Sequence, residues 1–537
     1  MTAWIDTPVL IVGGGPVGLA LALDLGWRGI DCTLIERGDG TVDLPKMNSV
    51  SLRTMEFCRR WGVDGEVKRC PFPDDFPLDE AFVTRLGGHE LFRLEKPARK
   101  FHKPGPHSPE SMQVCSQFWF DPILKARAWS YPSVRLRYRH RLDSFRDTGD
   151  AVEADVTELE AGHRLRFRAR YLIACDGAAS SVRDTLGIRL SGPGVLGNSL
   201  HAFFRAPGLI ERLGARPANF YLCVDHEGLW GSLRIIDPAN AMWRLMIDDA
   251  KEVDLNTIDF DVLLARALVQ PVAVEWLKSS YWTRRALVAE RYSSNRVFLA
   301  GDAAHQVSPT GGQGMNVGLA DAVDLGWKLA AVLQGWGGKR LLASYDAERR
   351  PTGARAVRMT TGYYDDARRL PAEPAIDHET REGAAARERL AHHIAESTSR
   401  EFRTLGLQLG YCYEGSPLCV PDGTGALPDD PQHYLPSARP GARAPHFFLP
   451  DGRSVLDLFG RGFVLLRLGP EAPHVQPLVA AAAERGVPLR VEDIASPEAL
   501  KRYERRLVLV RPDGHVAWRG DEAPADCEAV VDRVRGV

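Results

Sequence analysis

Residues 297–316 carry side chains whose types and spacing suggest chemistry. A run of apolar residues, typical of a buried strand, ends at Gly301 and Asp302, and a loop rich in proline and glycine follows. A helix is predicted to begin near Gly314, and the free N–H groups at a helix start bind negative charge. The pattern predicts a cradle for a flavin. Asp302 would hold the ribityl chain, and the helix start would face the ring edge where negative charge develops on reduction.

Glycines near the N-terminus predict the other half of this site. An apolar run at residues 9–12 precedes Gly13, Gly15 and Gly18, whose G-x-G-x-x-G spacing opens a helical pattern. The first glycine permits a tight turn, the second lets the backbone approach a pyrophosphate, and the third lets helix and strand pack closely. A second apolar run leads to Glu36, roughly 20 residues after the glycines, where a ribose-binding acid is expected. These features predict a Rossmann-type unit that binds a dinucleotide.

A third motif lies between these two segments. Residues 171–175 have the composition of a buried strand, and Asp176, a run of small residues and Arg183 follow. Asp-Gly pairs are common in turns, but small residues beside an acid and an arginine also permit close approach to a pyrophosphate. The position of this motif between the other two favours the cofactor interpretation.

The order and spacing of the three motifs resemble those of the single-component FAD-dependent aromatic hydroxylases, the family of para-hydroxybenzoate hydroxylase and phenol hydroxylase. The resemblance covers roughly residues 8–360. It adds two flavin-contacting positions, Lys46 and Gln117. Just after Gln117, Phe120-Asp121 replaces the Leu-Glu that is usual in the family. The cofactor-binding residues that it implies are Gly13, Gly15, Pro16, Gly18, Glu36, Arg37, Lys46, Gln117, Asp176, Arg183, Gly301, Asp302, Pro309, Gly312, Gly314, Met315 and Asn316.

The resemblance implies a monooxygenase that uses FAD, NADPH or NADH, and O2. In this family, reduced flavin forms a C4a-hydroperoxide that transfers one oxygen atom to an electron-rich ring, so we expect a small phenolic or aromatic substrate. A single dinucleotide fingerprint is present, and the flavin takes it. The nicotinamide nucleotide is therefore expected to bind transiently across the same site, with the motif from Asp176 to Arg183 serving both.

The sequence does not single out the residue that assists loss of the phenol proton. A phenol with a pKa of about 10 needs a base or a hydrogen-bond partner at neutral pH. By resemblance, Asn48 replaces an aspartate near the substrate, Pro309 lies beside the reactive face of the ring, and His305 belongs to a flavin-holding motif. Residues on predicted strands could bind a phenolic oxygen or a carboxylate: Tyr221, His226, Arg234 and Arg244. We predict Asn48, Pro309 and Tyr221 as catalytic candidates.

The pattern of apolar runs and breaks predicts an α/β fold with three parts. These are a Rossmann-type FAD-binding domain, an inserted β-sheet substrate domain and a C-terminal thioredoxin-like domain that lacks the CxxC pair and has no catalytic role. The proline-rich residues 71–110 are expected to form a loop with little regular structure. The predicted bounds are 1–75, 111–190 and 285–400 for the FAD-binding domain, 76–110 and 191–284 for the substrate domain, 401–444 for a linker and 445–537 for the C-terminal domain.

Composition limits the other possibilities. The 537 residues are 44% hydrophobic and 26% charged with a net charge of −2, which predicts neither a nucleic-acid nor a membrane partner. No apolar run is long enough to cross a bilayer. Nine scattered cysteines without metal-like spacing predict reduced thiols, no metal site and a cytoplasmic location. By resemblance, we expect a homodimer.

Three alternatives stay open. Within the hydroxylases, the substrate is either a simple phenol or a polycyclic aromatic natural product, for which the chain would be a tailoring hydroxylase. Another flavin oxidoreductase, of the halogenase or prenyl reductase type, is less favoured because the tryptophans are isolated rather than in a Trp-x-Trp pattern. A chaperone of the Rab escort type would need no flavin, and it would not require the intact residues 301–316.

Overall fold

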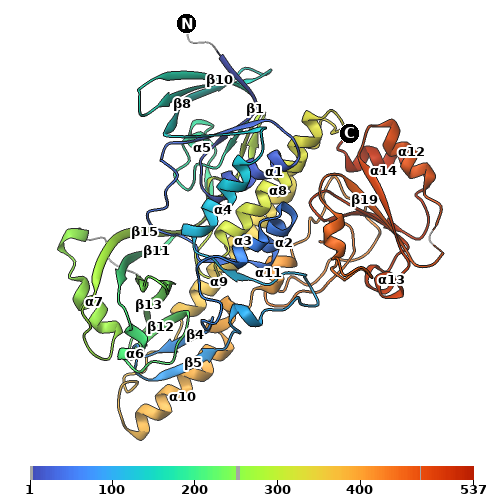
Figure 1. The fold of residues 1–537 in the computed structure, drawn as a ribbon. Helices are drawn as coiled ribbons and strands as arrows, with labels where there is room; N and C mark the ends of the chain where they lie inside the picture. The colour runs from blue at the N-terminus through green and yellow to red at the C-terminus, as the bar shows by residue number, and fades with distance from the viewer. Residues whose placement is uncertain (1–3, 249–253, 472) are drawn as a thin grey trace.

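The computed structural model describes residues 4–248, 254–471 and 473–537. The described residues form a mixed α/β structure with two eight-stranded sheets, a four-stranded sheet and a two-stranded sheet (Figure 1). The two-stranded sheet joins β3 (Ser49–Val50) to β6 (Gln113–Val114). Other short elements are α3 (Asp64–Lys68), α5 (Ser181–Thr185), α6 (Leu209–Arg212), α7 (Phe260–Ala267) and α11 (Leu405–Leu409).

The first eight-stranded sheet builds the predicted Rossmann-type unit. Its main strands are β16 (Ser293–Ser294), β17 (Val297–Leu299), β10 (Arg164–Ala174), β1 (Trp4–Val12), β2 (Cys32–Glu36) and β7 (Val134–Tyr138), in this order, and β8 (His140–Asp147) and β9 (Val152–Glu158) pair beside β10. The pairings from β17 to β7 are parallel. The carboxyl ends of β17, β10 and β1 are therefore adjacent, and each of the three motifs follows one of these ends.

Buried helices cover this sheet. Helices α1 (Pro16–Trp27) and α8 (Gly314–Leu333) lie side by side, with α4 (Gln117–Trp129) against α1 (Figure 1). Helix α2 (Leu52–Trp61) also contacts α8. Ser51 caps its start by accepting a hydrogen bond from the Thr54 N–H, and Gly62, with a φ of +73°, ends it in the left-handed conformation.

The second eight-stranded sheet lies apart from the first sheet, on the other side of helices α1 and α8 (Figure 1). In spatial order its strands are β18 (His305–Gln306), β15 (Glu275–Ala289), β11 (Leu190–Arg205), β14 (Met242–Asp248), β13 (Gly228–Asp237), β12 (Phe220–Asp225), β4 (Glu80–Val83) and β5 (Glu90–Leu94). Helix α9 (Ser344–Arg368) packs against β15, and α10 (Arg381–Glu396) packs near β5. The short 3-10 helix η4 (Thr398–Phe402) follows α10.

The loop prediction for residues 71–110 is wrong in part, because this segment supplies β4 and β5 to the edge of the second sheet. All four residues of β4 are buried, so the strand shows no alternation of polar and apolar side chains. Its pairing partner β12 lies about 140 residues further along the chain. A strand that is buried on both faces between proline-rich stretches gives no local signal.

The C-terminal part forms the predicted thioredoxin-like unit, orange and red in Figure 1. Its sheet order is β20 (Leu489–Ile494), β19 (Phe463–Leu468), β21 (Leu507–Val510) and β22 (Val516–Gly520), with α12 (Gln476–Glu484), α13 (Pro497–Tyr503) and α14 (Cys527–Val534). Residues 511–515 form the turn between β21 and β22, as their composition predicts. The fully buried Trp327 of α8 contacts Phe463 of β19, with ring centroids 6.1 Å apart, so this unit shares a core with the FAD-binding helices.

Among the described residues, no helix is long and apolar enough to span a bilayer. Within the same ranges, no cluster of histidine, cysteine and acidic side chains has the arrangement of a metal site.

Candidate functional site

The N-terminal glycines have the geometry that a dinucleotide requires. Gly13 has a φ of +111°, and a Cβ added there would lie 2.3 Å from the carbonyl oxygen of Cys175. A Cβ at Gly18 would lie 2.0 Å from the carbonyl oxygen of Gly13. Both positions therefore require glycine. At Gly15 a Cβ would have no neighbour within 4 Å, so this backbone is open to an approaching phosphate.

Glu36 lies at the carboxyl end of β2, beside the first turn of α1. Its carboxylate accepts hydrogen bonds from the N–H groups of Gly14, at 2.7 Å, and Gly38, at 2.6 Å. These bonds fix the acid at the edge of the glycine turn, where a ribose would lie. Arg37 next to it is exposed, and Pro16 occupies the first turn of α1, where its missing N–H costs no helical hydrogen bond.

The motif at residues 176–183 joins the loop after β17 through Arg183. Its guanidinium donates to the carbonyl oxygens of Ala178, at 3.1 Å, and Ala303, at 3.3 Å. Oδ2 of Asp176 accepts a bond from the Val182 N–H at 3.3 Å, whereas Oδ1 is buried without a partner among the described residues. A buried acceptor of this kind is expected to bind a ligand group or water.

The loop from Gly301 to Gly312 presents its key residues to the surface of the chain. Asp302, Pro309 and Gly312 are exposed, and Asp302 makes no hydrogen bond with any residue in the described ranges. A Cβ at Gly312 would have no neighbour within 4 Å. A free carboxylate and an open glycine backbone are what the ribityl hydroxyls and the ring edge of FAD require. The donor and acceptor set therefore fits this cofactor.

Asp321 of α8 holds the Gly301 turn from behind. Its carboxylate accepts from the Gly301 N–H at 3.1 Å, pairs with His305 Nε2 at 2.7 Å and pairs with Arg349 Nε at 2.8 Å. Burial alone would raise the pKa of Asp321, but the charges of His305 and Arg349 hold it below its ordinary value. His305 therefore helps to position the Gly301 turn through its contact with Asp321.

The start of α8 is tied to the start of α2 by Asn316. Its Oδ1 accepts hydrogen bonds from the Ser51 N–H, at 2.9 Å, and the Thr54 hydroxyl, at 2.8 Å. Its Nδ2 donates to the carbonyl oxygen of Gly312 at 2.8 Å. The side chain predicted to contact FAD is thus used within the protein. Gly314 and Met315, both partly exposed, leave the first backbone N–H groups of the helix for a ligand.

The predicted cofactor contact Gln117 and the catalytic candidate Asn48 lie on neighbouring segments of the chain. Gln117 accepts a bond from the N–H of the exposed Lys46 at 2.9 Å and donates to Asp121 at 2.9 Å. Burial raises the pKa of Asp121 to about 7. Asn48 is only 7% exposed, and neither its amide oxygen nor its amide nitrogen has a partner among the described residues. An orphaned buried amide is expected to bind a ligand, so Asn48 stays a candidate.

Two arginines face each other on the second sheet. Arg234 of β13 and Arg244 of β14 are direct cross-strand neighbours, and like charges in this arrangement repel. Neither makes an ion pair within the described part of the chain, and the Nε of each is buried without a partner. Burial and the charge of Arg234 lower the pKa of Arg244 to about 9. Arg234 stacks on Phe220, with its guanidinium carbon 3.8 Å from the ring centroid.

Glu401 was not predicted from the sequence. It lies between the face of the second sheet that carries Arg234 and Arg244 (the arginine face) and the loop at residues 301–312 (the flavin loop). Its carboxylate accepts from the Gly311 N–H at 3.1 Å, and the adjoining Phe402 packs against Phe220 at 6.3 Å between ring centroids. Burial raises the pKa of Glu401 to about 7. Arg284 of β15 also reaches the loop, at 3.0 Å from the Thr310 hydroxyl. No local pattern marks Glu401, because it falls in residues 401–444, which are predicted as linker.

The structure does not bring Tyr221 or His226 to the arginine face. In the strand register, Phe220 is opposite Arg234, whereas Tyr221 is opposite Leu233 and therefore points to the other face of the sheet. The Tyr221 hydroxyl accepts from the Ala218 N–H and donates to the Arg216 carbonyl oxygen, both at 2.8 Å. His226 lies exposed in the turn after β12. The alternation of side chains along the strand separates both residues from the arginines.

Two protein-family models match this chain. A family model described as FAD binding domain matches residues 6–360, and a model of the aromatic-ring hydroxylase C-terminal domain matches residues 437–537. The 4-methyl-5-nitrocatechol 5-monooxygenase of Burkholderia sp is 33% identical over 572 residues, which cover 99% of this chain and 98% of that protein.

Solved structures match over the same extent. RebC soaked with chromopyrrolic acid, with bound 7-carboxy-K252c, has a TM-score of 0.93 and 41% identity, covering 99% of this chain and 100% of that chain. A ternary complex of aklavinone-11 hydroxylase with FAD and aklavinone has a TM-score of 0.81 and 31% identity, covering 99% of each chain. The chain therefore belongs to the FAD-dependent aromatic-ring hydroxylases, and it is a monooxygenase that binds FAD.

Proposed function

We propose that this monooxygenase hydroxylates an aromatic natural product that carries a carboxylate, as a tailoring hydroxylase. The observation that carries the proposal is the directly opposed pair Arg234 and Arg244, which has no carboxylate partner among the described residues. Two partly buried guanidinium groups side by side repel each other and lose hydration. A substrate carboxylate between them would offset both effects and would bind through charge-assisted hydrogen bonds.

The names of the relatives support a substrate of this class. The RebC structure holds 7-carboxy-K252c, a compound whose name includes a carboxy group, and the aklavinone-11 hydroxylase structure holds aklavinone. The Burkholderia relative favours a second candidate, a small nitrocatechol-like phenol without a carboxylate. The arginine pair favours the first candidate, because a neutral phenol would leave both guanidinium groups unpaired.

The residues around the substrate have separable roles in this proposal. FAD, when bound, supplies the electron transfer and the oxygen chemistry. Arg234 and Arg244 orient the ring by its carboxylate. Glu401, with a pKa of about 7 and a hydrogen bond to the loop beside the ring, takes the proton of the phenol, and the orphaned amide of Asn48 binds a polar group of the substrate or the flavin. We assign the proton-accepting role to Glu401, whereas Tyr221, a catalytic candidate from the sequence, lies on the other face of the sheet.

NADPH or NADH as electron donor and O2 as oxidant belong to the same proposal. The single G-x-G-x-x-G motif supports transient binding of the nicotinamide nucleotide, since a dedicated second domain would carry another. Nine free cysteines, most of them buried, support a reducing compartment such as the cytoplasm. The homodimer expected from the resemblance stays a prediction.

A matched pair of substrates tests the proposal. Holoenzyme is mixed with NADPH or NADH, oxygen and a phenolic aromatic acid or its methyl ester, and NAD(P)H oxidation, oxygen uptake and hydroxylated product are measured. We expect coupled turnover only with the free acid. Arg244→Met should lower kcat/KM for the acid by about 100-fold, whereas Arg146→Met, at an exposed position of β8, should leave it unchanged.

Two outcomes would contradict parts of this proposal. Equal turnover of acid and ester would show that the arginine pair does not read the carboxylate and would favour the small-phenol candidate. Failure of every phenol to couple oxygen uptake to product would remove hydroxylation of a phenol, while flavin binding and the fold would still stand.

A further inference from the structure

A cavity of about 210 Å³ lies between α2 and the C-terminal unit. Its walls come from the end of α1, from α2, from Pro109 and from two segments of the C-terminal unit, so four separate parts of the chain line it. It shares no lining residue with the FAD loop or with the arginine face of the second sheet. A single water needs only about 10–15 Å³ of such space, so the cavity has room for a larger ligand.

Three arginines of α2 line this cavity, and two of them have carboxylate partners. Arg59 pairs with Asp457 at 2.6 Å and with Glu110 at 3.1 Å. Arg53 pairs with Glu56 at 2.7 Å and donates to the carbonyl oxygen of Asp513 at 2.9 Å. Even so, the Nε of Arg53, a residue only 5% exposed, is buried without a hydrogen-bond partner.

Arg60 is the third arginine, and it has no acidic partner within the described ranges. Its Nη1 is buried without a hydrogen bond, and its guanidinium carbon lies 5.8 Å from the centroid of the Phe57 ring. Burial, followed by the charge of Arg28, lowers the pKa of Arg60 to about 10. Among the residues that line the cavity, three arginines therefore stand against two carboxylates, Glu56 and Asp457.

The nearby acids are already bound to other groups. Asp24 accepts from Arg28 Nε at 2.7 Å and from the Trp61 indole N–H at 2.9 Å. Glu56 is shared between Arg53 and Arg443. None of these carboxylates can move to Arg60 without leaving another buried cation unpaired, which is strongly unfavourable.

Gly514 keeps the space between the two guanidinium groups open. A Cβ placed at Gly514 would lie 3.7 Å from Nη2 of Arg53 and 3.7 Å from Nη2 of Arg60. Both groups therefore converge on one point beside the turn that joins β21 to β22. Two guanidinium groups that converge on one point present a fork of N–H donors that matches the oxygens of a phosphate or sulfate.

We propose that this cavity binds a small tetrahedral oxyanion, such as inorganic phosphate or sulfate, between Arg53 and Arg60. The anion would balance the unpaired charge of Arg60 and would bridge α2 to the turn at Gly514. It would therefore stabilise the docking of the C-terminal unit on the FAD-binding helices. Because a ligand that binds only the folded state raises its stability, the site should be visible as an anion-dependent unfolding temperature.

Thermal unfolding of the FAD-loaded enzyme tests this proposal. Unfolding temperatures are compared in potassium phosphate, sodium sulfate and sodium chloride at one pH and one ionic strength. We expect phosphate and sulfate to raise the wild-type temperature relative to chloride. The increment should disappear in Arg60→Met and persist in Arg453→Met, an exposed arginine of the C-terminal unit. The readout is the increment, so a lower basal stability of Arg60→Met does not obscure it.

Direct binding gives the second measurement. Equilibrium dialysis of holoenzyme with radioactive phosphate should find one equivalent per chain, bound at least about tenfold more weakly by Arg60→Met. If Arg60→Met does not fold, Arg60→Lys serves instead, with the same loss of the fork. The proposal is overturned if wild type binds no stoichiometric phosphate, or if wild type and the Arg60 variants show equal increments. Turnover is not part of either readout, so the substrate proposal stands or fails separately.

Discussion

Asp302 carries the acceptor that we expect to hold the ribityl chain of FAD. It is exposed and makes no hydrogen bond with the described residues, so its replacement should disturb the protein itself very little. Asp302→Ala should therefore fold normally and weaken FAD binding by about 10- to 100-fold, because hydrogen bonds to a charged group contribute about 1.5–3 kcal/mol. Flavin fluorescence titration measures the change. Asp155→Ala, on the exposed face of β9, is the matched control, and unchanged affinity in Asp302→Ala would contradict the assignment.

Glu401 is the residue through which pH should act on the reaction. With its pKa raised to about 7, the base form appears only as pH rises through 7, so the hydroxylation rate should rise over that range. In Glu401→Gln this limb should be lost and the rate at pH 7 should fall by about 100-fold, the usual contribution of a positioned base. Rapid-mixing product formation across pH measures it. An unchanged pH profile would remove Glu401 from the mechanism, and Glu396→Gln, at an exposed position of α10, is the control.

The same raised pKa gives Glu401 a stability effect of known sign. Between pH 4.5, the ordinary pKa, and pH 7, the folded state binds more protons than the unfolded state. Stability of the wild type therefore falls as pH rises through this window. Glu401→Gln should unfold at a higher temperature than wild type at pH 8, and the difference should vanish below pH 4.5. Parallel pH series of thermal unfolding measure both curves.

At the scale of elements, Asp321 connects α8 to the Gly301 turn and to α9. Asp321→Asn would leave the buried guanidinium of Arg349 without a full counter-charge and would weaken the bond to His305. Breaking a buried ion pair typically costs about 3–5 kcal/mol, so we expect a loss of this order in the free energy of unfolding. Urea unfolding with FAD present measures the loss. Asp155→Asn, which changes an exposed pair with Arg166, should cost less than about 1 kcal/mol.

Local elements were predictable where one stretch of chain specifies its own geometry. The strand, glycine turn and helix from residue 9 onward depend on Gly13 and Gly18, whose conformation and close contacts leave no alternative residue. The helix start at Gly314 and the hairpin turn at residues 511–515 are of the same kind. Long-range pairing was not predictable: β4 gains its place only by pairing with β12.

The face of the sheet that meets the flavin loop was likewise not predictable from the local sequence. Strand alternation separates Tyr221 from its neighbour Phe220, but the face that meets the flavin loop depends on how the whole sheet packs. Glu401 is the other example: it accepts a hydrogen bond from the Gly311 N–H, and the adjoining Phe402 packs on Phe220, a strand residue about 180 positions earlier. Side chains that become functional only through such contacts carry no local signature in the sequence.

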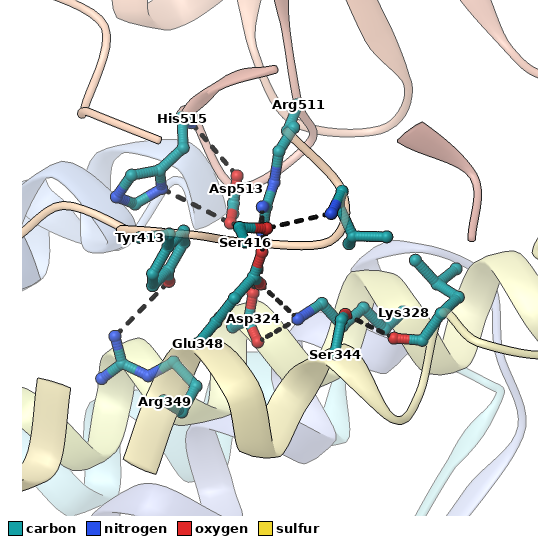
Figure 2. A network of polar contacts seen from close by, with 12 residues as sticks. Asp324, Lys328, Ser344, Glu348, Arg349, Tyr413, Ser416, Arg511, Asp513 and His515 are labelled. Carbon is teal, nitrogen blue, oxygen red and sulfur yellow. Dashed lines mark hydrogen bonds and ion pairs between the residues drawn. The ribbon is translucent and has the colours of Figure 1, made fainter. Parts of the chain in front are cut away.

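At the scale of the whole molecule, a buried network of charges fastens the C-terminal unit to the FAD-binding helices. Figure 2 shows Arg511, from the turn after β21, reaching down to Glu348 of α9 and Asp324 of α8. Lys328 of α8 bridges the same two carboxylates at 2.7 and 2.6 Å. His515, in the same turn, is 1% exposed, and its ring centroid lies 4.3 Å from that of Tyr413.

Within the described residues, Arg511 is the only cation of the C-terminal unit that pairs with both Glu348 and Asp324. Its loss should therefore affect the C-terminal unit and the FAD-binding helices together. Arg511→Met removes the partner of Glu348, at 2.5 Å, and of Asp324, at 3.2 Å, and leaves Lys328 alone between two buried acids. We expect a loss of about 3–5 kcal/mol in the free energy of unfolding, since an uncompensated charge stays buried. Because Asp321 lies one helical turn from Asp324 on α8, FAD affinity should fall together with stability.

Arg505→Met, which removes an exposed pair with Asp521 in the same unit, is the matched control and should cost less than about 1 kcal/mol. Urea unfolding followed separately by flavin fluorescence and by tryptophan emission distinguishes two ways of losing the network. If the two signals change together in Arg511→Met, the C-terminal unit and the flavin site unfold as one cooperative body, as their shared core at Trp327 requires. If the C-terminal unit unfolds first while flavin remains bound with unchanged affinity, the network fastens the unit without supporting the flavin site, and the coupling through α8 is wrong.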